Sequence, residues 1–382
     1  METLKTVVIG AGQAGLSAAY WLQRRGLRAW EDFVVLDAND GPGGAWRHRW
    51  ASLTFDAAHG LHPLPGLPLE APDPREPSSA VVGRYYGAYE REFALPVVRP
   101  ARVAAVARTD DGAALLVRAD DGREWRAGST AGAGPLLVRA DDGRSWLAQT
   151  VISATGTWDR PHWPHYPGQE LFRGRQLHTH DFVSAEEFRG QRVLVVGGGT
   201  SALQFLLQLD ASGATTHWST RRPPEFRKAP FDADWGIDVE RRVNERTRAG
   251  LPPLSVVGAT GLPLTEQYRA GIDAGVLVSE GPLERITAHG ALLANGTELE
   301  LDAILWATGF RASLGHLAPL RLREPGGGVL MAEDGVSVVR EPRLFLVGYG
   351  ASASTIGATR AGRAAAVAAT RALAAVPEAQ SA

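Results

Sequence analysis

Short, mainly apolar runs recur along the chain, and each is followed by glycines. The run Thr6–Ile9 leads into a glycine turn and a helical stretch, and Val193–Val196 leads into a second turn of the same kind. Runs of this length without polar alternation are typical of strands buried on both faces of a parallel sheet. Three further runs share this pattern: Phe33–Leu36, Val151–Ala154 and Leu344–Val347. The pattern predicts an α/β fold with two Rossmann-like dinucleotide-binding domains.

The segment 97–150 alternates apolar and polar residues instead, as strands joined by Asp-Gly turns do. It contains a tandem copy, because Leu115–Trp125 recurs as Leu136–Trp146 with one substitution. Each copy is predicted to form a hairpin with its turn at Asp-Gly. Two copies are too few for a solenoid, so the duplication at 115–146 is interpreted as a local surface feature without function.

Helical periodicity is predicted in two other places. Tyrosines at spacings of three and four in Val82–Phe93 favour core packing, and an alanine-rich helix closes the chain from about Ile356. The segment 225–274 is mostly polar and partly helical, and it shows no pattern of a site.

The first glycine turn has the spacing of a dinucleotide-binding motif, with small residues at Gly10, Gly12 and Gly15. These glycines permit a tight turn, close approach to a pyrophosphate and close packing of the helix, in that order. The helix start presents N–H groups, including those of Gln13 and Ala14, to phosphate. Asp37, beside Ala38, ends the next strand, where a carboxylate accepts hydrogen bonds from a ribose. The alternative is a glycine-rich turn in another α/β fold.

The second turn places small residues at the same three positions, Gly197, Gly199 and Ala202. Thr200 and Ser201 lie between them, at the predicted helix start. The following strand ends at Arg221 and Arg222 instead of a carboxylate. Guanidinium groups there favour a 2′-phosphate, so the second fold is predicted to bind NADPH and the first a non-phosphorylated dinucleotide. The alternative is a solvated strand end.

A third glycine-rich stretch contains Gly44, Ala45 and Trp46. Backbone at successive glycines can lie flat against a planar ring, and a nearby tryptophan can shield that ring. The proline-rich segment 51–77 follows and contains His59 and His62; a long loop after a cofactor turn is often part of a site. The alternatives are a plain loop and structural histidines.

Composition narrows the function classes. A net charge of -2 gives no electrostatic reason to expect nucleic acid or an anionic membrane as partner. Because the sequence has no cysteine, thiolate metal sites, a catalytic cysteine and dithiol redox chemistry are excluded, and no metal site is expected. No apolar run is long enough to span a bilayer, and no signal peptide is expected, so a cytoplasmic location is predicted.

Together these residues resemble the flavin-containing monooxygenases, and the resemblance covers essentially the whole chain. The matching positions are the two glycine turns with Asp37, Gly43-Gly44-Ala45-Trp46, the fingerprint Phe172, Gly174, His178 and Phe182, and Ala307-Thr308-Gly309-Phe310. The resemblance implies that the first fold binds FAD and the second NADPH. It implies that His178 belongs to the joint between the domains and does not act as a base.

The resemblance also implies a domain arrangement, with an FAD-binding domain at 1–160 and 306–382 and an NADPH-binding domain inserted at 161–305. Apart from the residues of the turns, the expected cofactor contacts are Val103, Thr155, Gly156, Thr308, Gly309 and Gly348. A homodimer is the commonest oligomeric state for such a chain.

Two features depart from the family pattern. The fingerprint ends in Phe182-Val183 where Baeyer–Villiger relatives carry Trp-Pro or Trp-Asp, which argues against ketone insertion. Many members also carry an asparagine in the loop after Trp46. None occurs before Pro77, and His59, nearest the expected place, is the catalytic candidate.

The resemblance implies an NADPH-dependent FAD monooxygenase that oxygenates an amine or sulfide through a flavin C4a-hydroperoxide. The expected partners are a small-molecule substrate and oxygen. One alternative is a reductase or oxidase that passes electrons to a quinone, a carrier or oxygen. A Baeyer–Villiger monooxygenase and a redox sensor have less support.

Overall fold

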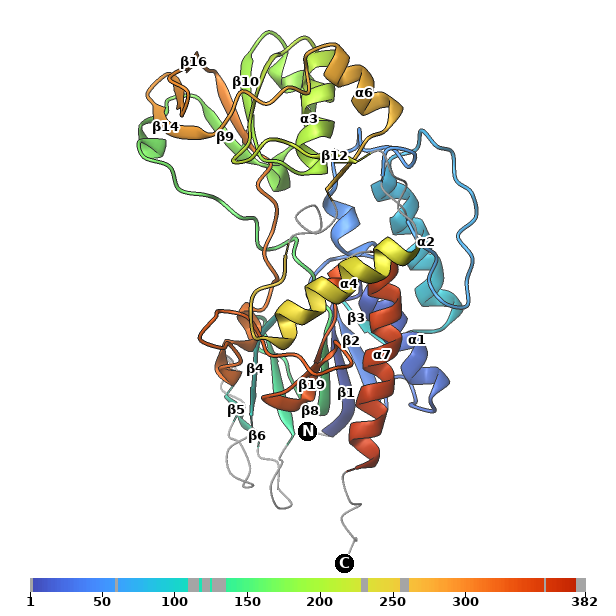
Figure 1. The fold of residues 1–382 in the computed structure, drawn as a ribbon. Helices are drawn as coiled ribbons and strands as arrows, with labels where there is room; N and C mark the ends of the chain where they lie inside the picture. The colour runs from blue at the N-terminus through green and yellow to red at the C-terminus, as the bar shows by residue number, and fades with distance from the viewer. Residues whose placement is uncertain are drawn as a thin grey trace, which may run out of the picture.

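The structure is a computed structural model that describes residues 3–58, 61–108, 117–118, 124–125, 135–227, 233–254, 261–353 and 355–375. Its two main sheets lie at opposite ends of the molecule, and two chain segments cross between them (Figure 1). Both sheets carry the parallel strands that the short apolar runs predict, so the prediction of an α/β fold with two Rossmann-like domains is confirmed.

The first sheet has the strand order β18-β19-β8-β1-β2-β3. From β19 to β3 all neighbours are parallel, while β18 is an antiparallel edge. These strands are β18 (Ser337–Val338), β19 (Glu341–Leu346), β8 (Ser145–Ser153), β1 (Thr3–Ile9), β2 (Phe33–Leu36) and β3 (Val97–Val98). An antiparallel extension on β8 is formed by β7 (Leu136–Ala140) and β4 (Val103–Arg108).

The second sheet is parallel throughout, in the order β11-β10-β17-β9. Its strands are β11 (Thr215–Ser219), β10 (Arg192–Val196), β17 (Ala303–Trp306) and β9 (Arg175–His178). A three-stranded antiparallel sheet comprises β14 (Leu283–Thr287), β15 (Gly290–Leu293) and β16 (Glu298–Glu300). Two short pairs are β12 (Phe226–Arg227) with β13 (Leu262–Pro263), and β5 (Val117–Arg118) with β6 (Glu124–Trp125).

Helices cover both sheets. The α-helices are α1 (Gln13–Arg24), α2 (Ser78–Glu92), α3 (Thr200–Ala211), α4 (Ala233–Arg248), α6 (Glu266–Asp273) and α7 (Thr355–Ala374). The 3-10 helices are η1 (Gly44–His48), η2 (Gln169–Leu171), η3 (Thr179–Asp181), η4 (Ala185–Phe188), η5 (Gly315–Leu320) and η6 (Gly350–Ala353). In the described part of the chain, no helix combines the length and apolar character that crossing a membrane requires.

The closing helix α7 packs very closely on α1. A side chain added at Gly362 would place its Cβ 2.5 Å from the Ala14 carbonyl oxygen, so the backbones touch there. Ala365, Ala366 and Ala369 are fully buried on the same face. Small residues therefore allow the alanine-rich C-terminal helix to pack directly on the start of α1.

Helix α4 lies in the range predicted for the inserted domain, but its contacts are with the first sheet's connections. The Met331 N–H donates to the Thr247 carbonyl oxygen at 3.1 Å, and the Arg248 guanidinium donates to the Glu333 carbonyl oxygen at 2.7 Å. Figure 1 shows α4 beside α7 and away from α3. The polar sequence of this segment carries no apolar pattern that would assign it to either sheet.

The two crossing segments pair with one another. Pro161 and Phe310 form an antiparallel bridge, the Arg311 N–H donates to the Arg160 carbonyl oxygen at 2.8 Å, and the Ser313 N–H donates to the Gly156 carbonyl oxygen at 2.9 Å. The segments cross side by side, green and orange in Figure 1. This pairing holds the two crossing segments against each other between the two sheets.

The duplicated hairpin contributes its second copy to the first sheet. In that copy β7 and β8 pair antiparallel across a turn where Gly143 has a φ of +86°, as an Asp-Gly turn requires. In the first copy β5 pairs with β6, while the intervening turn lies outside the described residues. The pairing to β4 and β8 is made by β7, whose Leu136 and Val138 are fully buried.

Deleting residues 115–135 should therefore leave the fold intact. The deletion joins Ala114 to Leu136 and shortens the β4–β7 connection roughly fourfold, which lowers the closure cost by about 1 kcal/mol. Thermal unfolding should show an unchanged or slightly raised Tm. A fall of more than about 5 °C would show that the first copy contributes to the core.

Candidate active site

The parallel strands of the first sheet end at a group of closely packed glycines. A Cβ at Gly10, whose φ is +101°, would lie 2.6 Å from the Ala154 carbonyl oxygen. A Cβ at Gly15 would lie 1.8 Å from the Gly10 carbonyl oxygen, and one at Gly44 would lie 2.8 Å from the Gly12 Cα. Glycine at these three positions is therefore required by the protein's own packing.

Gly12 is different, because the protein itself gives no reason for a glycine there. Its φ of -83° is ordinary, and an added Cβ would meet no described atom within 4 Å. A Cβ added at Gly156 would likewise meet no described atom within 4 Å. Open space at the start of a 12-residue helix, with free N–H groups, fits the pyrophosphate of a dinucleotide. The residues present therefore fit FAD at this edge.

Asp37 lies at the end of β2, only 4% exposed, and its carboxylate already has protein partners. Arg99 Nε donates to Oδ2 at 2.8 Å, and Asn39 Nδ2 donates to Oδ1 at 3.1 Å. The Arg99 guanidinium also forms a bidentate pair with Glu90 at 2.6 and 2.7 Å. A carboxylate oxygen accepts more than one hydrogen bond, so a ribose hydroxyl can still be received.

Sequence reasoning missed Arg99, Glu90 and Asn39. Residues 90 and 99 lie far from the glycine turn in sequence. The parallel pairing of β2 with β3 brings Arg99 to the end of β2, and Arg99 in turn binds Glu90 of α2. The predicted contact Val103 packs in the same apolar cluster as Leu36, at the end of β2.

Gln13 uses its side chain within the protein. Its Nε2 donates to the His62 carbonyl oxygen and to Thr359 Oγ1, both at 3.0 Å, and Tyr86 donates to its Oε1 at 3.3 Å. The side chain thus ties the start of α1 to α7, to α2 and to the loop after Trp46. Any cofactor contact of Gln13 and the buried Ala14 falls to the backbone.

The glycine-rich stretch before Trp46 forms the start of η1, with Gly43 at a φ of +123° and Gly44 at +54°. Ala45 is exposed, and Trp46 is partly buried between the core clusters of the first and second sheets. Trp46 therefore lies where the two sheets face one another, as a residue that shields a cofactor ring would.

The two Ala-Thr-Gly motifs hold the crossing together. Thr155 Oγ1 donates to the Ser313 carbonyl oxygen at 2.7 Å, and Thr308 Oγ1 donates to the His162 carbonyl oxygen. Each threonine hydroxyl thus bonds the other crossing segment, and the threonines position the backbone of Gly156 and Gly309. A Cβ at Gly348 would lie 3.4 Å from the Gly156 Cα, so the last strand turn also reaches this place.

The fingerprint residues are structural. His178 is fully buried; its Nδ1 accepts from the His180 N–H at 3.1 Å, which leaves Nε2 to donate to the Gly309 carbonyl oxygen at 3.0 Å. Burial lowers the pKa of His178 to about 4. Phe182 packs against Trp50 and Phe205 in the core of the second sheet. His178 is neutral at pH 7 and has no ring nitrogen available to act as a base.

The second glycine turn repeats the geometry of the first. A Cβ at Gly197, whose φ is +146°, would lie 2.1 Å from the Ala307 carbonyl oxygen, and Trp218 Nε1 donates to the Gly197 carbonyl oxygen at 2.7 Å. Gly199 caps α3, Thr200 and Ser201 are its first residues, and Ala202 is fully buried against the strand.

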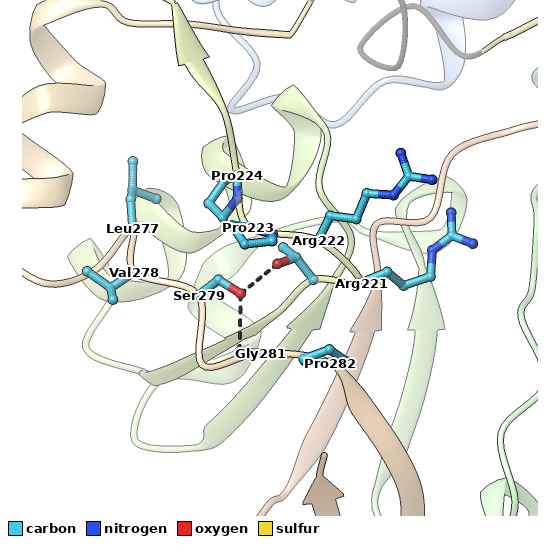
Figure 2. A pocket seen from close by; sticks show the side chains of 10 residues that line it. Arg221, Arg222, Pro223, Pro224, Leu277, Val278, Ser279, Gly281 and Pro282 are labelled. Carbon is cyan, nitrogen blue, oxygen red and sulfur yellow. Dashed lines mark hydrogen bonds between the residues drawn. The ribbon is translucent and has the colours of Figure 1, made fainter. Parts of the chain in front are cut away.

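A pocket of about 330 Å³ lies at the end of β11. It is lined by Thr220, Arg221, Arg222, Pro223, Pro224, Leu277, Val278, Ser279, Gly281 and Pro282. Both guanidinium groups extend to the same side, away from Leu277 and Val278 (Figure 2). Neither arginine forms an ion pair with a described residue, which suits the binding of an external anion.

The predicted catalytic residue His59 lies outside the described residues, so its position relative to the turns stays a prediction.

Comparisons with known proteins agree with this geometry. Residues 8–66 match the family described as NAD(P)-binding Rossmann-like domain, and residues 136–252 match the family described as pyridine nucleotide-disulphide oxidoreductase. A chain without cysteine cannot carry out the dithiol chemistry in the second name. The fold and its two turns define a flavoprotein with two dinucleotide-binding domains.

Similar proteins define the family more narrowly. A flavin-containing monooxygenase from Stenotrophomonas maltophilia is 36% identical, with a TM-score of 0.76, over 97% of this chain and 99% of that one. Indole-3-pyruvate monooxygenase YUCCA1 from Oryza sativa subsp. japonica is 29% identical over 90% of this chain and 86% of its own. Senecionine N-oxygenase from Tyria jacobaeae is 24% identical over 80% of this chain and 58% of its own.

The chain belongs to the flavin-containing monooxygenase family. It is an oxidoreductase that uses FAD and NADPH, as predicted from its sequence motifs.

Gly12→Ala should separate cofactor binding from folding. The new Cβ meets no described atom within 4 Å, so the FAD-free protein should lose at most about 1 kcal/mol, while FAD affinity falls about ten- to hundredfold. Thermal unfolding of the FAD-free protein and titration with FAD measure the two effects. Gly10→Ala is the matched control and should destabilise the FAD-free protein itself. Equal loss of stability in both variants would contradict the assignment.

Stability should fall as pH drops from about 6.5 to 4. Burial lowers the pKa of His178 and of His316 to about 4, so between these pH values the unfolded chain binds more protons than the native one. Each histidine contributes ~3 kcal/mol of stability above pH 6.5 that is lost towards pH 4. Denaturant titrations of His316→Gln should show a flatter pH dependence than the parent protein. Parallel curves would contradict the prediction.

Proposed function

We propose that this protein oxygenates a soft nucleophile, an amine or a sulfide, at the expense of NADPH and oxygen. The observation that carries the proposal is the convergence of both glycine turns on one crossing, where Gly156 and Gly309 are held by reciprocal hydrogen bonds. Support also comes from two relatives whose names describe a monooxygenase and an N-oxygenase.

The residues of the first sheet's edge would bind FAD, which when bound and reduced supplies the activated oxygen. The turn at Gly12 would receive the pyrophosphate, and Asp37 would accept hydrogen bonds from the ribose. Gly44, Trp46 and Gly156 would lie against the flavin ring. The remaining FAD contacts would come from Ala38, Ala45, Val103, Thr155, Thr308, Gly309 and Gly348.

The second turn would bind NADPH. The N–H groups at the start of α3 would receive its pyrophosphate, and the two arginines at the pocket would pair with the 2′-phosphate. His178 acts as a positioning residue, because it fixes the carbonyl of Gly309 where the domains meet. The protein's own contribution is thus binding, orientation and exclusion of water.

Product analysis tests the proposed activity. With FAD, NADPH and a panel of sulfides, amines and ketones, we expect sulfoxides or N-oxides in amounts that match NADPH consumption, and no esters from ketones. Hydrogen peroxide equal to the NADPH consumed, without oxygenated product, would show an oxidase or reductase instead.

Replacing Arg221 and Arg222 together by alanine should change cofactor choice. Loss of a charged bidentate contact is worth roughly 1.5–3 kcal/mol, so the KM for NADPH should rise about ten- to hundredfold while that for NADH stays nearly constant. Arg189→Ala, which removes an exposed arginine paired with Glu186, is the control. Equal rises in both KM values would remove the 2′-phosphate assignment.

We further propose a cytoplasmic homodimer, supported by the lack of cysteine and by the frequency of twofold assemblies.

A further inference from the structure

Arg49 is a cation close to three segments that are proposed to contact the cofactors, those that contain Trp46, Trp158 and Phe310. Its guanidinium carbon lies 4.5 Å from the ring centroid of Trp158, 5.8 Å from that of Trp46 and 6.0 Å from that of Trp50. Trp46 follows the glycine stretch and lies within η1, and Trp158 lies two residues after Gly156. Trp158 also stacks on Phe310, the residue after Gly309, with the ring centroids 5.0 Å apart.

No described residue forms a hydrogen bond or an ion pair with the Arg49 guanidinium. Burial lowers the pKa of Arg49 to about 10, and no carboxylate in the described part of the chain opposes this shift. Three acidic residues lie close to Arg49 or Trp158 in sequence, and each has another partner. Asp40 pairs with Arg47 at 2.5 Å, Asp159 pairs with Arg102 at 3.1 Å, and Asp56 accepts a hydrogen bond from Thr54 Oγ1 at 2.5 Å. A desolvated cation without a counterion is costly, and proteins usually pair such a group.

The aromatic contacts leave the hydrogen-bonding capacity of this arginine intact. A guanidinium over a tryptophan ring is attracted through its face, which fixes its plane. Its five N–H donors lie in that plane, and two of them can bind the two oxygens of one carboxylate at the same time. The guanidinium is therefore suited to bind a planar anion such as a carboxylate.

We propose that Arg49 binds the carboxylate of the substrate, so that this enzyme acts on nucleophiles that carry an acid group. The inference rests on the proposed monooxygenase function and narrows its substrate class. It is distinct from the 2′-phosphate assignment, because Arg221 and Arg222 lie at the end of β11 in the second sheet.

A matched substrate pair tests the proposal. (Phenylthio)acetate carries both a sulfide and a carboxylate, and its methyl ester carries only the sulfide. The parent enzyme should show a higher kcat/KM for the acid. Arg49→Gln should lower kcat/KM for the acid about ten- to hundredfold and leave that for the ester within about twofold. The kcat/KM of Arg49→Lys for the acid should lie between those of the parent enzyme and of Arg49→Gln, because an ammonium keeps the charge but cannot form the bidentate contact.

Arg47→Gln is the control variant, since Arg47 lies two residues away on the same turn and is exposed and paired with Asp40. It should change neither substrate's kinetics. Equal losses for acid and ester in Arg49→Gln would overturn the proposal. A raised KM for NADPH in Arg49→Gln, without dependence on substrate charge, would assign the residue to the cofactor and overturn it as well.

Binding measurements separate this inference from the proposed function. Benzoate, phenylacetate and (phenylthio)acetate should raise the Tm of the FAD-bound parent protein and not of Arg49→Gln. If these shifts occur and no sulfoxide forms from any sulfide, the monooxygenase proposal fails while the carboxylate site stands. If sulfoxides form but no acid binds in an Arg49-dependent way, the carboxylate site is wrong and the monooxygenase proposal stands.

Discussion

The structure depends on one backbone contact that is made twice. In each of the two main sheets, the first glycine of the dinucleotide turn faces the carbonyl oxygen of the alanine that begins an Ala-Thr-Gly motif. The distances from the ideal Cβ positions, 2.6 Å from Gly10 to Ala154 and 2.1 Å from Gly197 to Ala307, leave no room for any side chain. Close packing excludes even a methyl group there, so the turn and the motif form one packed unit in both domains.

That contact explains how the chain brings two nucleotide sites together. Each Ala-Thr-Gly motif ends a strand and starts a crossing to the other sheet. Because the glycine turn contacts the first residue of this motif, the turn always lies next to the crossing. The threonine hydroxyls then bond across to the opposite segment, and His178 adds a bond to the Gly309 carbonyl. The edges where the two dinucleotides are proposed to bind are therefore connected through the backbone of the two crossing segments, with no acid–base group required.

The site divides into residues whose roles the motifs indicated and residues that appear only in the fold. Spacing and residue type predict roles for Gly12, Asp37 and the arginines after β11, because each motif is local and its expected chemistry follows from its position at a strand end. The Arg99–Glu90 pair behind Asp37 carries no such signal, and the same is true of Arg49. An arginine in a loop usually extends into water, and only the fold shows that the guanidinium of this one lies beside three tryptophan rings.

The sequence by itself determined the two parallel sheets, the two cofactors and the family, because buried parallel strands and glycine turns are encoded by consecutive residues. It also indicated that the Asp-Gly repeat forms hairpins. Only the tertiary structure decided that α4 contacts the connections of the first sheet, that the two crossings pair, and that Arg49 lies among tryptophans with no counterion among the described residues. These features depend on contacts between segments distant in sequence, whose partners no local pattern specifies.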